Sequence, residues 1–383
     1  MYLMSAYKKK FYSSLITLGS ILFTLGLLFI LRLSKDFSEF WSRTISRVEQ
    51  YIAHTIFGWL PFSAFELFIW FIIILIITFL VLLIRHLVRF GLRGSSKYYL
   101  NFSIIISLIL LVYMGTAGME YNRYPVDIPQ HTELIDDVNI YKEMAMHYQK
   151  DYNEISKTLE YDNNGMLIRP YSNKKMNEIM KEEFHKLDDS KYFTKITPSG
   201  KHMVMWGWLY RELQITGIAF APLGEPNINQ LCTPGEYPFT LAHEIAHTKG
   251  IIREEDANLV AAYICLNSSD PYLRYSGYVW TISSLASLVR CTNVEQDYKD
   301  FQYGFSKECV LDSHARYDYW QKHDLLGKFS DWLNNLYLYI QGDKGTESYS
   351  DNIDIHEDTS THEYKVSSYS RYQALYLWMY LDK

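Results

Sequence analysis

The sequence predicts an α+β fold that is mostly helical, with three transmembrane helices followed by a soluble domain outside the cytoplasm. Three observations lead to this prediction. Three long apolar runs fall within the first 118 of the 383 residues, the remaining residues have the composition of a globular domain, and two histidines at helical spacing follow a segment with strand character. The hydrophobic fraction of 48% is ordinary for a globular protein, so the uneven distribution along the chain carries the information.

The three apolar runs are Phe11 to Leu31, Ala64 to Ile84 and Tyr98 to Gly118. Each is close to the ~20 residues that a helix needs to cross the hydrocarbon core, and charged residues are almost absent from them. Buried core helices are the alternative, but three runs of this length favour membrane spans. A signal peptide is the alternative interpretation of the first run, but no small-residue cleavage site follows it. We expect a membrane anchor over residues 1–118, a soluble domain over 119–350 and a C-terminal extension over 351–383.

The placement of lysine and arginine predicts the orientation of these spans, because cytoplasmic loops carry the positive excess. Lys8, Lys9 and Lys10 precede the first span, and four basic residues crowd the 85–97 loop between the second and third spans. We therefore expect a multi-pass protein of the cytoplasmic membrane whose N-terminus is cytoplasmic and whose C-terminal domain is extracytoplasmic. Four basic residues between the first and second spans oppose this orientation: Arg32, Lys35, Arg43 and Arg47.

The segment between the first two spans, residues 35–59, predicts an amphipathic helix. Its apolar residues recur at helical spacing: Phe37, Trp41, Ile45, Val48, Ile52, Ile56 and Trp59. A helix of this kind lies at the membrane surface with its apolar face in the lipid. A helix that packs on the soluble domain has the same pattern, so both interpretations stay open at this point.

Charge and cysteine content narrow the range of partners. The net charge of −6 gives no basic surface for nucleic acid, which is therefore not expected as a partner. The four cysteines all fall in the soluble domain and match no zinc-knuckle spacing: Cys232, Cys265, Cys291 and Cys309. Outside the cytoplasm they can pair in three ways, but free buried thiols are an equal alternative.

The stretch PFTLAHEIAHTKG, residues 238–250, predicts a metal site with its own catalytic base. Thr240 can cap a helix that begins at Leu241, and Gly250 can end that helix in a left-handed conformation. His243 and His247 then lie four residues apart on one face, where two imidazoles can bind one tetrahedral ion. Glu244 points aside from the ion but can reach a water bound to it. A charged helix that contains this short pattern by chance is the alternative.

A third metal ligand is expected from the stretch REEDANLVAAYIC, residues 253–265, which predicts a second helix that folds back beside the first. Glu254 follows His247 by seven residues, and Asn258 lies one turn further on, where its amide can support the ligands. The alternative is that Glu254, Glu255 and Asp256 only favour the positive end of the helix. We expect Glu254 as the ligand, because adjacent helical residues point about 100° apart and Glu255 shares a face with apolar Leu259.

The chain resembles the DUF3810 family of uncharacterised bacterial membrane proteins, which have a predicted zincin-like site. The segments that carry the resemblance are WLPFSAFELF at 59–68, LGEPNIN at 223–229, PFTLAHEIAHTKG at 238–250, EEDAN at 254–258, LRYSGYVW at 273–280 and YLYIQGDKGTESYS at 337–350. The resemblance implies a zincin-like extracytoplasmic domain with Zn²⁺ bound by His243, His247 and Glu254. It also implies Glu244 as the base, in an arrangement similar to that of gluzincin peptidases. Asp256 departs from the glutamate that is usual there, and the last thirty or so residues have no counterpart.

These features predict a membrane-anchored, zinc-dependent hydrolase, a metallopeptidase that acts on peptides or proteins at the outer face of the cytoplasmic membrane. A metal-binding surface sensor or assembly factor without turnover is the alternative. Catalysis also needs a donor for the oxyanion, for which Arg274, Tyr275 and Tyr278 are candidates, although for each taken singly a packing or hydrogen-bonded role in the core is slightly favoured. The segment 214–222 predicts an edge strand able to pair with an extended substrate. Two further residues are either turn-forming or cleft-lining: Glu225 and Asn227.

Overall fold

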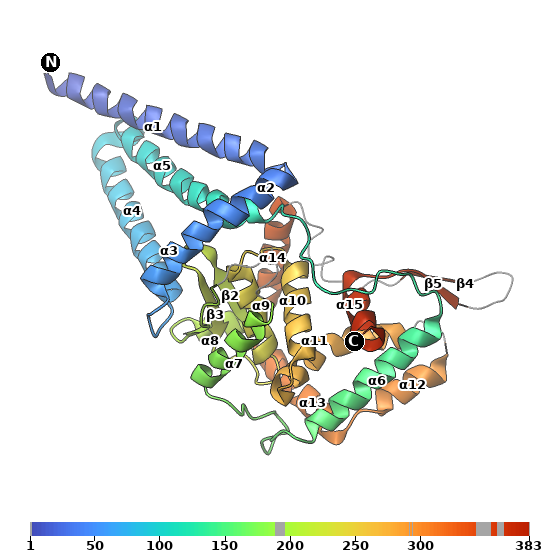
Figure 1. Ribbon diagram of the computed structural model, residues 1–383. Coiled ribbons are helices and arrows are strands. Elements are labelled where there is room, and N and C mark those ends of the chain that lie inside the picture. The colour runs from blue at the N-terminus through green and yellow to red at the C-terminus, as the bar shows by residue number, and fades with distance from the viewer. Residues whose placement is uncertain are drawn as a thin grey trace. The chain divides into compact units, whose positions relative to one another are not determined.

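The computed structural model describes residues 2–187, 196–290, 292, 294–341, 354–357 and 364–382. Contacts within the chain divide it into two compact units (Figure 1). Unit 1 consists of Met1–Pro125 together with the inserted segment Phe220–Glu225, and unit 2 consists of Val126–Ala219 and Pro226–Lys383. The first segment of unit 1 thus ends seven residues after the boundary expected at residue 118, and the insertion of Phe220–Glu225 was not predicted.

Unit 1 is built mainly from long apolar helices. Three of its helical stretches are long and apolar enough to cross a membrane, which fits a membrane-anchored protein: Lys9–Arg32, Ala64–Gly91 and Ser96–Gly118. Gly91 ends the second stretch because its positive φ of 65° breaks the helical backbone. The elements of unit 1 are α1 (Tyr2–Arg32), α2 (Lys35–Trp41), η1 (Ser42–Ser46), α3 (Arg47–Phe57), α4 (Ala64–Gly94), α5 (Ser96–Tyr113), η2 (Met114–Gly118) and η3 (Ala221–Leu223).

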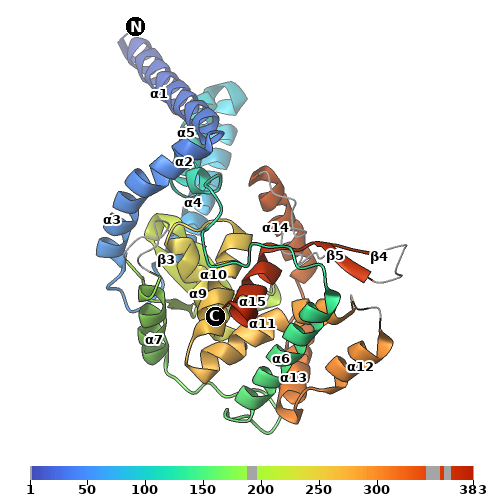
Figure 2. The same ribbon diagram turned by 45° about the vertical axis from the view of Figure 1, so that its right-hand side comes forward.

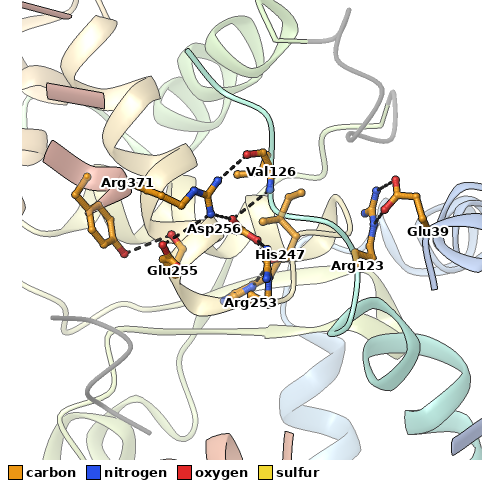
Figure 3. Close-up of polar contacts among 10 residues, drawn as sticks. Glu39, Arg123, Val126, His247, Arg253, Glu255, Asp256 and Arg371 are labelled. Carbon is orange, nitrogen blue, oxygen red and sulfur yellow. Dashed lines mark hydrogen bonds and ion pairs between the residues drawn. The ribbon is translucent and has the colours of Figure 1, made fainter. Parts of the chain in front are cut away.

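The segment between the first two spans forms α2, η1 and α3, and its apolar side chains face outward. The exposed fraction is 60% for Val48, 52% for Ile52 and 75% for Trp59. Some of its polar side chains are buried instead, among them Glu39, which binds Arg123 at 3.0 Å (Figure 3). An apolar face exposed on unit 1 can contact either lipid or protein, so both interpretations from the sequence stay open.

Unit 2 is mostly helical and contains the strands. Its helices are α6 (Val138–Ser156), α7 (Asn173–His185), α8 (Gly207–Glu212), α9 (Tyr237–Thr248), α10 (Glu254–Asn267), α11 (Pro271–Arg290), α12 (Glu295–Tyr303), α13 (Lys307–Lys322), α14 (Gly327–Gln341) and α15 (Arg371–Leu381). Its strands are β1 (Lys201–Met203), β2 (Gly217–Phe220), β3 (Glu225–Asn229), β4 (Asp354–Glu357) and β5 (Tyr364–Ser368).

The small sheet of unit 2 places β2 at an edge. Among the described strands the order is β1-β3-β2, and β1 pairs with β3 in parallel. The expected strand in segment 214–222 is therefore confirmed as β2, and it lies at an edge of the described sheet. A second, two-stranded antiparallel sheet joins β4 to β5.

The core of unit 2 forms where α6, α9, α10 and α11 pack together. The apolar residues of α9 and α10 contribute much of it, and Leu241, Ile245 and Leu259 are fully buried. Helix α15 packs against α6 and α10, as Figure 2 shows, and it buries Leu375 and Leu377 completely. Helix α15, which lies in the expected C-terminal extension, is thus a component of the core.

Candidate metal site

Helix α9 carries the His-Glu-x-x-His stretch and begins earlier than the sequence predicts. It starts at Tyr237, with Pro238 in the first turn, where proline is favoured because its missing N–H has no helical partner. Thr240 is therefore an internal residue and not the N-cap, so that prediction is wrong. Every residue of α9 except His243 is buried, which holds the helix rigidly in the core.

The end of α9 positions the second histidine. Gly250 has a φ of 91°, which confirms the expected left-handed residue, and its N–H donates to the carbonyl of His247 at 3.0 Å. The N–H of Ile251 reaches back to Ala246 at 3.1 Å, completing a Schellman motif. The carbonyl of Ile251 then accepts a hydrogen bond from Nδ1 of His247 at 2.7 Å. This bond fixes the orientation of the imidazole and leaves Nε2 as the nitrogen that can bind a metal ion.

Helix α10 begins immediately after the turn and brings its first residue to the histidines. Oε2 of Glu254 lies 3.1 Å from Nε2 of His243, and Oε1 lies 3.6 Å from Nε2 of His247. Glu255 points elsewhere, with a carboxylate oxygen 3.8 Å from Arg371. The choice of Glu254 over Glu255 agrees with this geometry. Asn258 is buried one turn further on, and its support of the ligands stays a prediction.

The three ligating atoms form a cluster whose size fits a tetrahedral ion. They all lie within 4.8 Å of one another, and the two histidine Nε2 atoms are 2.9 Å apart. Bonds of about 2.0–2.1 Å at tetrahedral angles place ligand atoms about 3.3 Å apart. The contacts of 2.9, 3.1 and 3.6 Å, which involve both carboxylate oxygens of Glu254, scatter around that value. Two imidazole nitrogens this close also need a cation or a proton between them, because their lone pairs otherwise repel.

The charges of the cluster favour a cation as well. Burial lowers the pKa of His247, but the carboxylate of Glu254 outweighs that effect and raises the pKa to about 9. Burial alone raises the pKa of Glu254, whereas the two histidines lower it well below the usual range. The carboxylate is thus ionised and draws positive charge to the imidazoles. A proton or a divalent metal ion can satisfy this demand.

Glu244 lies beside the cluster, and one oxygen of its buried carboxylate accepts no hydrogen bond from the described residues. It is 5% exposed, and its Oε2 atom has no hydrogen-bond partner among the described residues. Burial raises its pKa, while the two histidines and the backbone N–H of Ala219 lower it. A buried carboxylate oxygen without a partner is costly, and such groups are typical of functional sites, so Glu244 is the candidate base beside this cluster.

Strand β2 covers Glu244 closely, a contact that was not predicted from the sequence. A Cβ atom on Gly217 would lie 2.6 Å from Oε1 and 2.7 Å from Cγ of Glu244. Only glycine leaves room for the base at this position. A glycine inside a strand pattern is a known sign of close backbone approach, so the sequence did contain a signal for this residue.

The first turn of α10 is held by a charged network around Asp256, drawn in Figure 3. Asp256 is 3% exposed and accepts hydrogen bonds from Arg253, from Arg371 and from the backbone N–H of Val126. Arg371 is the first residue of α15, near the C-terminus. The C-terminal helix therefore helps to fix the turn that carries Glu254, an arrangement that no local pattern predicts.

The three candidates for the oxyanion donor lie outside the cluster. The hydroxyl of Tyr275 donates to Asp312 at 2.7 Å, and both Tyr278 and Arg274 bind Asp151. Tyr275 is fully buried and Tyr278 is 2% exposed, so their hydroxyls need these internal acceptors. These contacts brace α11 against α6 and α13 and support the core interpretation.

The other candidate residues have structural roles. Glu225 and Asn227 both lie in β3 and are buried, so neither is a turn-forming or cleft-lining residue. Asn227 donates to the carbonyl of Ile218 in β2 at 3.3 Å. The described cysteines are free and buried, which leaves no disulfide among them: Cys232, Cys265 and Cys309. Cys291 lies outside the described residues.

Comparison with known proteins gives a family and no function. No curated protein matches the chain, and no solved structure matches it. The sequence model of one family, described as "Protein of unknown function (DUF3810)", matches residues 41–355. The match spans most of the membrane-anchor unit, the whole histidine–glutamate cluster and the helices around it. The chain therefore belongs to the DUF3810 family.

Proposed function

We propose that this protein is a membrane-anchored zinc hydrolase of the zincin type, a metallopeptidase that acts on peptides or proteins at the outer face of the cytoplasmic membrane. The observation that carries the proposal is the cluster of His243, His247 and Glu254, at separations suited to a tetrahedral ion, beside the buried carboxylate of Glu244. Two nitrogens and one carboxylate oxygen suit zinc, and they are the donor types of catalytic sites that keep one position open.

The residues divide the work of hydrolysis between binding and proton transfer. His243, His247 and Glu254 would hold the ion. A bound zinc ion supplies Lewis-acid polarisation of the scissile carbonyl and makes water more acidic. Glu244 accepts the proton of the attacking water and passes it to the leaving amine, and burial raises its pKa toward the range that suits such exchange. Metal analysis of the full-length protein, followed by peptide-library digestion with and without a chelator, tests the proposal.

The ligand assignment makes a specific prediction about two adjacent carboxylates. Glu254→Gln is expected to weaken zinc affinity on the order of 100-fold, because it removes a charged ligand. Glu255→Gln is the matched control and should leave the affinity within about threefold, since this partly exposed side chain lies 3.8 Å from Arg371 and outside the cluster. Competition with a chromophoric chelator measures both. Equal losses, or a larger loss at Glu255, would contradict the assignment.

The orientation of the anchor makes a second prediction. A cysteine introduced at Lys322, an exposed position at the end of α13, should react with a membrane-impermeant maleimide in intact cells. A cysteine at Arg93, in the basic loop between the second and third spans, should react only after lysis. Lysed cells provide the control because both positions are then reachable. If only Arg93→Cys were labelled in intact cells, the topology would be the reverse of the predicted one, and the proposed zinc site would lie in the cytoplasm.

A further inference from the structure

The segment Phe220–Glu225 interrupts unit 2 and belongs to unit 1, which contains the three apolar helices. The chain leaves unit 2 after Ala219, in strand β2, and returns at Pro226, in strand β3. Between them it forms the short helix η3 and a left-handed turn at Gly224, whose φ is 61°. Strand β2 contacts the proposed base directly, since Ala219 donates its N–H to Glu244.

Within unit 1 the segment caps the second apolar helix, α4. The carboxylate of Glu225 accepts hydrogen bonds from the first two N–H groups of that helix, those of Ala64 at 3.3 Å and Phe65 at 3.0 Å. Glu225 is 1% exposed. Its negative charge also faces the positive end of the helix, so the contact combines two charge-assisted hydrogen bonds with a favourable dipole interaction.

An aromatic contact adds to the cap. The ring of Phe220 lies 4.9 Å from the ring of Phe65 and 5.0 Å from that of Phe68, measured between centroids. Phe220 is also the last residue of β2. One covalent bond therefore separates a residue fixed on α4 from Ala219, the residue that binds the base, and a chain held at that point has little freedom to shift along the strand.

The fit between β2 and the base leaves little tolerance for such a shift. Gly217 approaches Glu244 so closely that even one added carbon atom would overlap it. A change in the height or register of β2 would move both this contact and the Ala219 hydrogen bond. The position of the Glu244 carboxylate, including its Oε2 atom without a hydrogen-bond partner among the described residues, thus depends on the position of β2.

We propose that Phe220 and Glu225 are positioning residues, through which the N-terminus of α4 holds strand β2 in place over the base. The apolar anchor is then part of the machinery of the site and not only a tether. The role given to the base rests on the proposed function, but the coupling between Glu225 and β2 does not. It can be measured in the protein without turnover.

Hydrogen–deuterium exchange on the full-length protein in detergent micelles tests the coupling. Glu225→Ala should accelerate exchange in the 214–219 segment by roughly tenfold or more, because the strand loses its fixed end. Exchange in α9 and α10 should stay as in the unchanged protein, and bound zinc should remain at the same stoichiometry. Glu225→Asp should restore most of the protection. Phe220→Ala should act in the same direction as Glu225→Ala.

Two matched variants serve as controls. Asp36→Ala removes an exposed acidic residue from the first turn of α2, elsewhere in unit 1, and Phe71→Ala removes an exposed phenylalanine from α4. Neither should change exchange in β2. Unchanged exchange in β2 for Glu225→Ala overturns the proposal, and so does faster exchange throughout unit 2, since the residue would then serve folding in general. A protein that binds no zinc but shows the coupling would refute the proposed function alone.

Discussion

Replacing His247 with alanine is expected to lower the zinc affinity of the full-length protein by roughly 100- to 1,000-fold. Structural zinc sites bind with about 10–16 kcal/mol, and sharing this among about four ligands gives roughly 2.5–4 kcal/mol for each one. His247 is also the ligand whose orientation the α9 turn fixes, through Nδ1 and the carbonyl of Ile251. Replacing it therefore removes a metal ligand that is held in a fixed orientation, and no neighbouring side chain is expected to take its place.

His323→Ala is a matched control for this measurement. His323 also lies beside a glutamate, since its Nδ1 is 3.0 Å from Glu212, but it belongs to no ligand cluster among the described residues. Zinc content by mass spectrometry and the zinc-dependent rise in melting temperature should both be lost in His247→Ala and kept in His323→Ala. A His247→Ala protein with the same zinc stoichiometry and affinity would show that the cluster is a hydrogen-bonded core group.

The parts of the site that local geometry dictates could be predicted from the sequence. Two histidines four residues apart must share a helix face, and a glycine three residues after the second one gives the helix a place to end. Glu254 could be preferred over Glu255 because a helix separates adjacent side chains by about 100°. The structure agrees with each of these steps, and all of them concern contacts within twelve residues of chain.

The expectations for the oxyanion donor depended on partners far away in the sequence. Nothing near Tyr275 or Tyr278 reveals that their hydroxyls meet Asp312 and Asp151, which come from α13 and α6. A tyrosine beside a metal and a tyrosine satisfied in the core have the same local pattern, so only the tertiary packing decides between them.

Helix α15 shows the same limitation at the level of a whole element. Its sequence has no motif that relates it to the metal site, yet Arg371 binds Asp256 and the apolar residues of the helix complete the core. The insertion of residues 220–225 into the anchor unit is also invisible in the sequence, because Glu225 has the same chemistry whether it caps α4 or lines a cleft. In both cases the information lies in what the residue meets after folding.

Glu244→Gln is expected to reduce peptide hydrolysis by roughly 100- to 10,000-fold while leaving zinc affinity within about threefold. Glutamine keeps the size of the side chain and its carbonyl can still accept the N–H of Ala219, so the close fit under Gly217 is preserved. What it loses is the ability to take a proton. Because Glu244 is not one of the three clustered ligands, the metal should stay bound.

A library of quenched-fluorescent peptides provides the measurement, with each protein loaded with one equivalent of zinc. Glu182→Gln is the control for the loss of a carboxylate, since Glu182 is exposed on α7. Full hydrolysis by Glu244→Gln would contradict its role as the base. If the unchanged protein binds zinc at His243, His247 and Glu254 but cleaves no peptide, the alternative of a metal-binding sensor or assembly factor without turnover is favoured. His247→Ala and Glu244→Gln therefore separate metal binding from catalysis. The first removes a metal ligand and leaves the base, and the second removes the base and leaves the metal ligands.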